Sequence, residues 1–345
     1  MPDNRKVRVM VLDDSPLFCD IMSKGLGGDE RIELVGFAGD PFDASAKIPE
    51  LEPDVITLDI EMPRMDGIKF LRSLMPQFPL PVIVISSLKA SVFEALDAGA
   101  IDFIAKPDNL TEESPRFFAN LKMKIIAASQ ARFAYRRREN TEIRLEPAGV
   151  PGSVDPRGII AIGASTGGTD AIKSIISKFS SNMPGFVIVQ HMPAGFTGMY
   201  AKRLDSISNL EVKEAADGDE VLPGRALLAP GDYHMTVEET GSGYLVRCTR
   251  GLKVNGHRPS VDVLFDSVAK AAGPRGIGII LTGMGTDGAA GLKKIRDCGG
   301  YTIGQDERSS VVYGMPLAAY IFGGVIVQVP LYRISDEIIR KLTSG

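Results

Sequence analysis

A serine stands in a short glycine-rich turn with the spacing of a nucleophile elbow. The segment Ile159–Gly168 reads IIAIGASTGG, in which an apolar run leads to Ser165 between Gly163 and Gly167. The apolar run predicts a buried strand, and Thr169–Lys178 has a helical pattern. Small residues on both sides of the serine allow a sharp turn that presents its hydroxyl at the carboxyl end of a sheet. Similar turns occur in proteins without catalysis, so this pattern alone makes Ser165 only a candidate nucleophile.

Two further polar residues follow apolar runs in the same half of the chain. His191 follows Phe186–Gln190, and Asp287 lies in a glycine-rich segment after Gly276–Leu281. If the three runs are neighbouring parallel strands, Ser165, His191 and Asp287 reach one rim of the sheet. There Asp287 would orient His191, His191 would take the proton of Ser165, and backbone N–H groups would stabilise the oxyanion. These residue types therefore predict nucleophilic acyl transfer.

Each of these residues also has a simpler interpretation. A histidine at a strand end is often structural, and an aspartate before a helix is often its N-cap. His257 precedes a predicted helix start at Ser260 and fits either a substrate-side group or a capping neighbour. His234 fits a structural role before a hairpin with its turn at Glu238–Gly243. The chain order Ser, His, Asp differs from that of the α/β-hydrolases, so the spacing around Ser165 does not indicate that fold.

The first half of the chain repeats an apolar run that ends in a polar residue, and helical segments separate the runs. This order predicts a parallel, doubly wound sheet whose strand ends meet at one rim. The runs are Val7–Leu12, Val55–Leu58, Val82–Ile85 and Phe103–Ala105. The polar residues that follow them are Asp13, Asp14, Asp59, Ser86 and Lys106. Three carboxylates repel one another unless a cation lies among them, and their oxygens suit Mg²⁺. Lys106 would neutralise a phosphoryl group, Ser86 would hydrogen-bond it, and Asp59 on the middle strand would accept it.

Composition restricts the class of protein. A length of 345 residues favours two domains, and 39 basic against 43 acidic residues give no global reason to expect nucleic-acid binding. Three widely spaced cysteines without C-x-x-C spacing indicate neither a disulfide framework nor a thiolate metal site. The sequence has no apolar signal core and no run long enough to span a membrane. We therefore expect a cytoplasmic protein without nucleic-acid partners or direct membrane insertion.

A change in composition marks the expected domain boundary. The segment Glu146–Gly158 holds three prolines and three glycines, which is typical of a linker. Before it, Phe117–Arg138 has a helical pattern, and Arg132–Arg138 carries four arginines. The arginines fit either a solvated face or a docking surface for an acidic partner. We expect a first domain over residues 1–125, a linker over 126–156 and a second domain over 157–345.

The motifs of the first half resemble those of response-regulator receiver domains. They are VLDDS at Val11–Ser15, LDIEMPRMDG at Leu58–Gly67, ISS at Ile85–Ser87 and FIAKP at Phe103–Pro107. The resemblance implies a flavodoxin-like receiver domain over residues 1–125. The roles that it implies are Asp59 as phospho-acceptor, Asp13, Asp14 and Asp59 as Mg²⁺ ligands, and Ser86 and Lys106 as contacts of the phosphoryl group. Phe103 matches the position of the aromatic switch residue, with packing in the core as the alternative.

The motifs of the second half look like the catalytic domain of the chemotaxis protein-glutamate methylesterases, the CheB family. They are GASTGG at Gly163–Gly168, QHMP at Gln190–Pro193, APGDYHM at Ala229–Met235, GHRPSVDVLF at Gly256–Phe265 and TGMGTDG at Thr282–Gly288. The similarity implies an α/β/α methylesterase domain over residues 157–345. The roles that it implies are Ser165, His191 and Asp287 as catalytic triad, with Thr166 beside the nucleophile and the backbone of Met284 near the oxyanion.

The family resemblance also implies a function. Its members hydrolyse glutamyl methyl esters on chemoreceptors, with release of methanol, and can deamidate receptor glutamines. The chain is thus expected to be a serine hydrolase of two-component signalling whose receiver domain inhibits the esterase until Asp59 is phosphorylated. The implied partners are methyl-accepting chemoreceptors and a chemotaxis-type histidine kinase, with Mg²⁺ at the receiver site and no cofactor for the esterase. Two alternatives stay open, a phosphorylation-dependent binding module with a silent second half and a serine hydrolase acting on a non-receptor ester.

Overall fold

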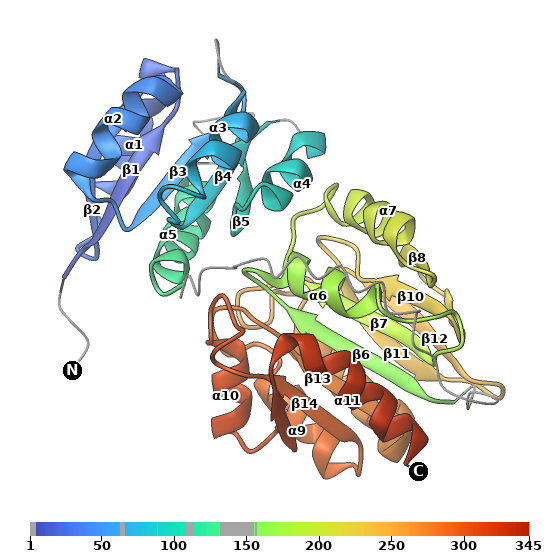
Figure 1. Ribbon diagram of the computed structural model, residues 1–345. Helices are drawn as coiled ribbons and strands as arrows, with labels where there is room; N and C mark the ends of the chain where they lie inside the picture. Colours follow the sequence, from blue (N-terminus) through green and yellow to red (C-terminus); the bar gives the residue numbers. More distant parts are fainter. Residues whose placement is uncertain are drawn as a thin grey trace. The chain divides into compact units, whose positions relative to one another are not determined.

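The computed structural model describes residues 5–62, 66–87, 89–107, 114–131, 155 and 157–344. The chain forms two compact units, Met1–Arg136 and Arg137–Gly345, which are described separately below (Figure 1). Helix α5 (Ser114–Ser129) continues into the first residues that the sequence assigned to the linker. The remainder of that linker, including its arginine-rich segment, lies outside the described residues apart from 130–131 and 155. Within the described ranges, no helix is long and apolar enough to cross a membrane.

The first unit is a parallel five-stranded sheet with helices on both faces, in the strand order β2-β1-β3-β4-β5. Its strands are β1 (Val7–Leu12), β2 (Ile32–Ala38), β3 (Val55–Asp59), β4 (Val82–Ser86) and β5 (Asp102–Ala105). Its other helices are α1 (Pro16–Leu26), α2 (Pro41–Leu51), α3 (Gly67–Leu74) and α4 (Lys89–Asp97). Helix α1 packs against α5, and α3 packs against α2 and α4. The prediction of a doubly wound α/β unit is confirmed.

Local sequence accounts for these elements. Every residue of β3 and β4 is buried, which is why both strands are continuous apolar runs. Helix α1 begins after Ser15, whose hydroxyl accepts a hydrogen bond from the N–H of Phe18, and Pro16 occupies its first position. Asp40 caps α2 in the same way. These caps set the loops that follow β1 and β2, so the rim of the sheet has a defined shape.

The second unit contains a seven-stranded parallel sheet in the order β15-β14-β13-β6-β7-β10-β8 and a three-stranded antiparallel sheet in the order β11-β12-β9. The strands of the large sheet are β6 (Ile159–Ala164), β7 (Gly185–Gln190), β8 (Glu211–Glu214), β10 (Arg225–Leu228), β13 (Gly276–Ile280), β14 (Tyr301–Gln305) and β15 (Val327–Val329). The small sheet consists of β9 (Glu220–Val221), β11 (His234–Glu239) and β12 (Tyr244–Thr249). The sequence predicted its hairpin but not its third strand.

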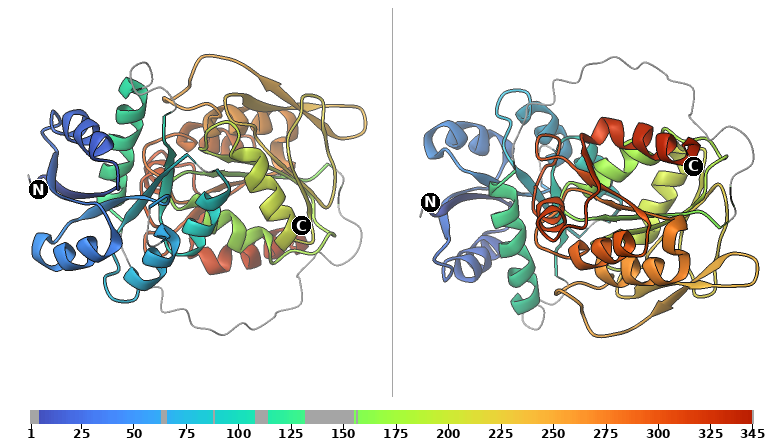
Figure 2. Two further views of the ribbon diagram at one scale, coloured as in Figure 1. Left: turned by 90° about the horizontal axis from the view of Figure 1, so that it is seen from above. Right: turned by 90° about the horizontal axis from the view of Figure 1, so that it is seen from below.

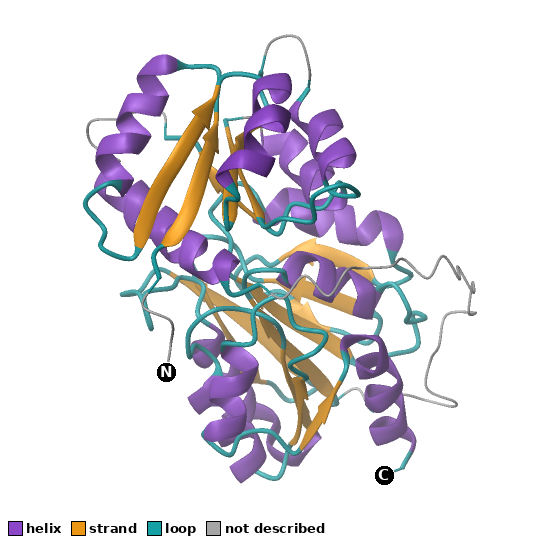
Figure 3. Ribbon diagram, turned by 60° about the vertical axis from the view of Figure 1, so that its left-hand side comes forward, coloured by secondary structure: helices purple, strands orange, loops and turns teal. Residues whose placement is uncertain are grey.

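Helices cover both faces of the large sheet (Figures 2 and 3). On one face α6 (Gly168–Ile176) packs against α11 (Leu331–Thr343). On the other face α9 (Ala289–Asp297) lies between α8 (Val261–Ala272) and α10 (Met315–Ile321). Helix α7 (Thr197–Ile207) packs on β8, and a short 3-10 turn (Gly273–Arg275) leads into β13. The second unit is therefore also a doubly wound α/β structure, as predicted.

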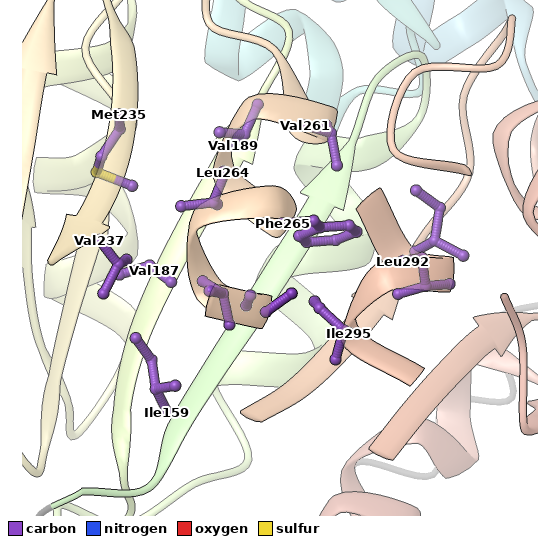
Figure 4. Close-up of a cluster of buried hydrophobic side chains, with 14 of the residues drawn as sticks. Ile159, Val187, Val189, Met235, Val237, Val261, Leu264, Phe265, Leu292 and Ile295 are labelled. Carbon is purple, nitrogen blue, oxygen red and sulfur yellow. The ribbon is translucent and has the colours of Figure 1, made fainter. Parts of the chain in front are cut away.

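Helix α8 anchors the core on its side of the sheet. Its side chains Leu264 and Phe265 are fully buried, together with Met235 of β11 (Figure 4). Burial of a large apolar side chain stabilises a fold by about 1.5–3 kcal/mol. The helix is thus held between the large sheet and the small one. Its N-terminus consequently has a fixed place at the rim where the large sheet's strands end.

Candidate active site

Strand β6, which precedes Ser165, lies between β7, which precedes His191, and β13, which precedes Asp287. Ala164 of β6 is paired with Gln190 of β7, so Ser165 and His191 leave adjacent strand ends. The N–H of His191 donates to the carbonyl of Ala164 over 3.0 Å, and the N–H of Ser165 donates to the carbonyl of Thr282 over 3.0 Å. The two candidate residues therefore emerge side by side at one rim.

Glycines around Ser165 are required by close contacts. Gly167 has φ 76° and precedes α6, and a Cβ atom there would lie 2.6 Å from Val311. A Cβ on Gly283 would lie 2.6 Å from the Cβ of Ser165 and 2.4 Å from the sulfur of Met315. Since real Cβ atoms do not approach so closely, larger residues would displace the turn. Ser165 itself remains partly exposed.

His191 and Asp287 form a buried hydrogen-bonded pair. The Nε2 of His191 lies 2.8 Å from Oδ2 of Asp287, and that oxygen also accepts the N–H of Val261 over 2.7 Å. The other oxygen, Oδ1, accepts the hydroxyl of Ser260 over 2.7 Å and the amide of Asn255 over 2.9 Å. The carboxylate therefore receives donors on both oxygens and lies at the N-terminus of α8, where the helix dipole favours negative charge.

This environment decides the charge of Asp287 and the tautomer of His191. Burial by itself would raise the pKa of Asp287, but the hydrogen bond and charge of His191, with the hydrogen bonds of Asn255 and Ser260, hold it well below its usual range. An ionised Asp287 accepts a proton-bearing Nε2, which leaves Nδ1 of His191 as the basic nitrogen. Nδ1 is buried and has no hydrogen-bond partner among the described residues. Its lone pair is free to take a proton, although no hydrogen bond joins it to Ser165 in this structure.

The alternatives for the other residues can now be compared with the structure. The N-cap of α9 is Gly288, so Asp287 does not cap the helix that follows it in the chain. Ser260 caps α8, as the sequence predicted. His257 stacks on His191, with ring centroids 3.7 Å apart and an interplanar angle of 6°. His234 is buried, and its Nε2 donates to a backbone carbonyl over 2.8 Å, which fits the structural role expected of it.

The residues expected near the oxyanion adjoin Ser165. Thr166 is the next residue and is buried, and its carbonyl accepts the hydroxyl of Thr282 over 2.9 Å. Met284 is partly exposed and follows Gly283, where an added Cβ would lie 2.6 Å from the Cβ of Ser165. Both backbones thus belong to segments that contact the turn of Ser165.

The first unit brings three acidic residues together at the end of its sheet. Carboxylate oxygens of Asp13, Asp14 and Asp59 lie within 4.8 Å of one another. The Nζ of Lys106 lies 2.9 Å from Asp13 and 2.7 Å from Asp59. Burial raises the pKa of Asp13, and the bond from Lys106 offsets only part of that shift. Burial would lower the pKa of Lys106, but its bonds to Asp13 and Asp59 outweigh this and raise it, so the lysine stays charged. An all-oxygen, anionic donor set of this kind fits Mg²⁺.

The two remaining predicted residues of this site differ in their surroundings. Ser86 ends β4, is fully buried, and accepts the N–H of Lys106 on its carbonyl over 3.0 Å. Phe103 is also buried, and its ring meets that of Phe93 in an edge-on arrangement with centroids 6.4 Å apart. In this structure Phe103 therefore packs in the core between β5 and α4.

Comparisons with known proteins identify the family. Residues 160–338 match the family model described as CheB methylesterase, and residues 9–113 match that of the response regulator receiver domain. The chain is 53% identical to a Syntrophomonas wolfei protein named protein-glutamate methylesterase/protein-glutamine glutaminase 2, covering 98% of both chains. The chain belongs to the CheB methylesterase family. A Pseudomonas aeruginosa protein of the same name is 45% identical and covers 97% of both chains. The crystal structure of the Thermotoga maritima CheB methylesterase catalytic domain is 40% identical, with a TM-score of 0.52, over 53% of this chain and 98% of that one.

Two polar residues at the candidate site of this CheB-family protein were missed by the sequence analysis. Gln190 is buried, and its amide donates to the carbonyl of Ser165 over 2.9 Å and to that of His191 over 3.4 Å. Asn255 donates to Asp287 from a loop far along the chain. The dipeptide Asn255-Gly256 is a turn signal, but it does not reveal what the asparagine faces.

Proposed function

We propose that the protein hydrolyses glutamyl methyl esters on methyl-accepting chemoreceptors and deamidates receptor glutamines at the same site. The observation that carries this proposal is the buried His191–Asp287 pair beside Ser165, with Nδ1 of the imidazole left without a partner among the described residues. The printed names of relatives such as the Syntrophomonas wolfei protein supply the substrate chemistry. We assign the receiver domain to residues 1–125 and the catalytic domain to residues 157–345.

The reaction follows from the roles of the three side chains. Ser165 Oγ attacks the ester carbonyl and its proton passes to Nδ1 of His191, while Asp287 stays ionised and stabilises the imidazolium. The tetrahedral intermediate collapses, His191 returns the proton to the leaving methoxide, and methanol departs. Water then attacks the glutamyl ester of Ser165 and gives a proton to His191, which passes it to Ser165 Oγ as the ester bond breaks. The products are a receptor carboxylate and the free serine.

Backbone groups supply the remaining electrostatic stabilisation. The N–H groups of Thr166 and Met284 are the proposed donors to the oxyanion, since both belong to segments in contact with the turn of Ser165. Loss of one such donor typically slows an acyl-transfer enzyme by about 10²–10³-fold. Deamidation uses the same acyl intermediate but expels ammonia, a poorer leaving group than methanol. We therefore expect it to be the slower reaction.

The receiver domain regulates the esterase in this proposal. Asp59 accepts a phosphoryl group from a histidine kinase, Asp13, Asp14 and Asp59 would hold Mg²⁺, and Lys106 and Ser86 contact the phosphoryl oxygens. Mg²⁺ would neutralise charge at the phosphoryl group. Phosphorylation replaces the Lys106–Asp59 ion pair and rearranges the residues around Asp59. Phe103 is the proposed aromatic residue that moves with this rearrangement. Such couplings are typically about 1–3 kcal/mol, or roughly 5–150-fold.

The testing experiment is methanol release from a methylated receptor fragment, with and without acetyl phosphate and Mg²⁺. We expect stimulation in the wild type and none in Asp59→Asn. Ser165→Ala should release no methanol while Asp59 is still phosphorylated, and the exposed Ser206→Ala should behave as wild type. If inhibition is correct, residues 155–345 alone should exceed the activity of the unphosphorylated full chain.

The alternatives give different results in the same assay. Hydrolysis of small methyl esters without any release from the receptor fragment would favour a serine hydrolase with another substrate. No release from any ester, with intact phosphorylation of Asp59, would favour a binding module with a silent second half.

A further inference from the structure

A tight turn at Val254–His257 places two side chains in contact with the esterase site. The N–H of Val254 donates to the carbonyl of His257 over 3.1 Å, and the N–H of His257 donates to that of Val254 over 2.9 Å. Between them, Asn255 has φ 52° and Gly256 has φ 81°. Positive φ at both central positions is typical of a type I′ turn, for which Asn-Gly is a preferred sequence. The turn therefore fixes the directions in which the side chains of Asn255 and His257 leave the backbone.

The amide of Asn255 bridges two carboxylates. Its Nδ2 lies 2.7 Å from Oδ2 of Asp262 and 2.9 Å from Oδ1 of Asp287. An amide nitrogen carries two hydrogens, so each carboxylate receives one. The carbonyl oxygen of the amide would be repelled by both carboxylates, so only its nitrogen can occupy this place. One neutral side chain thus satisfies two anionic groups.

The two carboxylates would otherwise destabilise each other. Burial raises the pKa of Asp262, the charge of Asp287 adds to that rise, and the bonds from Gly291 and Asn255 only partly offset it. A cation at this place would compete with His191 for Asp287, whereas a neutral donor does not. Asn255 therefore lowers the repulsion while leaving the charge of Asp287 available to the imidazole.

The same turn also contacts the other member of the pair. His257, which closes the turn, stacks on His191 with ring centroids 3.7 Å apart. Asp287 and His191 meet each other at 2.8 Å. One turn therefore contacts both partners of the hydrogen bond on which proton transfer depends.

We propose that Asn255 is a positioning residue of the esterase, which holds the carboxylate of Asp287 in the orientation that presents Oδ2 to His191. It acts through Asp287, and the turn that carries it supports the imidazole through His257. This inference rests on the proposed function, in which Ser165, His191 and Asp287 work together. Asn255→Gly tests it because glycine accepts the left-handed backbone and removes only the amide. Asn255→Asp keeps the shape of the side chain but replaces the donor with an acceptor.

The experiment measures how fast Ser165 of the full chain reacts with a fluorophosphonate probe, so it needs no receptor. The Oγ forms a bond to phosphorus, fluoride leaves, and the serine proton passes to His191. Loss of a hydrogen bond to a charged group corresponds to roughly a ten- to hundredfold change. We expect both Asn255 variants to react more slowly than the wild type by about this factor. Lys253→Ala, at an exposed neighbour in the same loop, should react at the wild-type rate, and Ser165→Ala should not be labelled.

The pH dependence of labelling separates positioning from a purely structural role. The additional carboxylate of Asn255→Asp favours the protonated imidazole, so the acidic limb of its profile should lie at higher pH than that of Asn255→Gly. Thermal unfolding of each variant checks that it is folded, and if one variant does not fold, the other decides. Wild-type rates and wild-type acidic limbs in folded variants would overturn the role of Asn255 alone. Absence of labelling at Ser165 in the wild type would overturn the proposed triad as well, so the two failures are distinguishable.

Discussion

The Nε2 of His191 lies 2.8 Å from Oδ2 of Asp287, although the two residues are 96 positions apart in the chain. His191 leaves the end of β7, whereas Asp287 lies in the loop between β13 and α9. Strand β6, which carries Ser165 at its end, lies between β7 and β13. The pair therefore spans the strand of the proposed nucleophile, and the order of the strands determines which residues can meet there.

Replacement of Asp287 by asparagine should lower kcat strongly. Whichever end of the asparagine amide faces Nε2, the NH2 group or the oxygen, it carries no negative charge. The imidazolium would therefore lose its buried counter-charge. Loss of this function in a serine triad typically costs about 10⁴-fold in kcat. Release of methanol from a methylated substrate measures the effect. Asp297→Asn is the matched control, because Asp297 is exposed and pairs with Lys293 at the surface of α9. Equal losses in both variants would contradict the role of Asp287.

The same carboxylate should make stability depend on pH in the acidic range. The folded protein holds the pKa of Asp287 below its unfolded value of about 3.9, so its stabilisation is present above that pH and is lost as the pH falls below it. The unfolding free energy of the wild type should therefore fall more steeply with acidification than that of Asp287→Asn. Urea unfolding followed by circular dichroism at a series of pH values measures this, and parallel curves would argue against the expected shift.

An alanine at position 283 should damage both stability and activity. Its Cβ would lie 2.6 Å from the Cβ of Ser165 and 2.4 Å from the sulfur of Met315, so the loop or the serine turn must move. Overpacking of this kind costs roughly 1–3 kcal/mol. Gly241→Ala is the control, because a Cβ there meets nothing within 4 Å. Thermal unfolding and ester hydrolysis should separate the two variants, and a fully active Gly283→Ala would show that the contact is unimportant.

The cysteines should differ in reactivity. Cys298 is exposed, whereas burial, together with the charges of Asp217, Asp219 and Glu214, raises the pKa of the Cys248 thiol to about 11. Because the thiolate is the reactive form, iodoacetamide at pH 8 should alkylate Cys298 well before Cys248 in the folded protein. Mass spectrometry of timed samples measures the order, and in urea the difference should disappear. Equal rates in the folded protein would contradict the assigned environments.

Several buried strands could be predicted closely from the sequence, but the buried strands β10 and β14 of the second unit were not predicted. The bounds expected for β1, Val7–Leu12, are those of the structure, and β3 and β4 differ from expectation by one residue at their ends. Because both faces of these strands are buried, their sequences are uninterrupted apolar runs. Strand β2 was missed because it is an edge strand, Ile32–Ala38, with partly exposed residues and a glycine inside it. The two-residue strand β9 is too short to carry any periodic pattern.

The site shows a similar division. The places of Ser165 and His191 at the rim were predictable because each residue directly follows a buried strand. Asp287 was predictable only from its glycine-rich surroundings, since several residues separate it from the end of β13. Asn255 and Gln190 were not, because their contacts depend on how a turn and a strand end pack against distant segments. Local patterns identify where the chain turns, whereas the partner of a side chain depends on the whole fold.

The order of the segments along the chain has a consequence for synthesis. The acidic cluster and Lys106 belong to the first unit, which is complete well before the ribosome reaches Asp287. Strand β13, which must bind the free edge of β6, is made long after β6 and β7. Since domains generally fold from the N-terminus during synthesis, the proposed phosphorylation site can form on a nascent chain that still has no catalytic domain. If Asp59 is the phospho-acceptor, as proposed, a prematurely terminated chain would take phosphoryl groups without producing any enzyme activity.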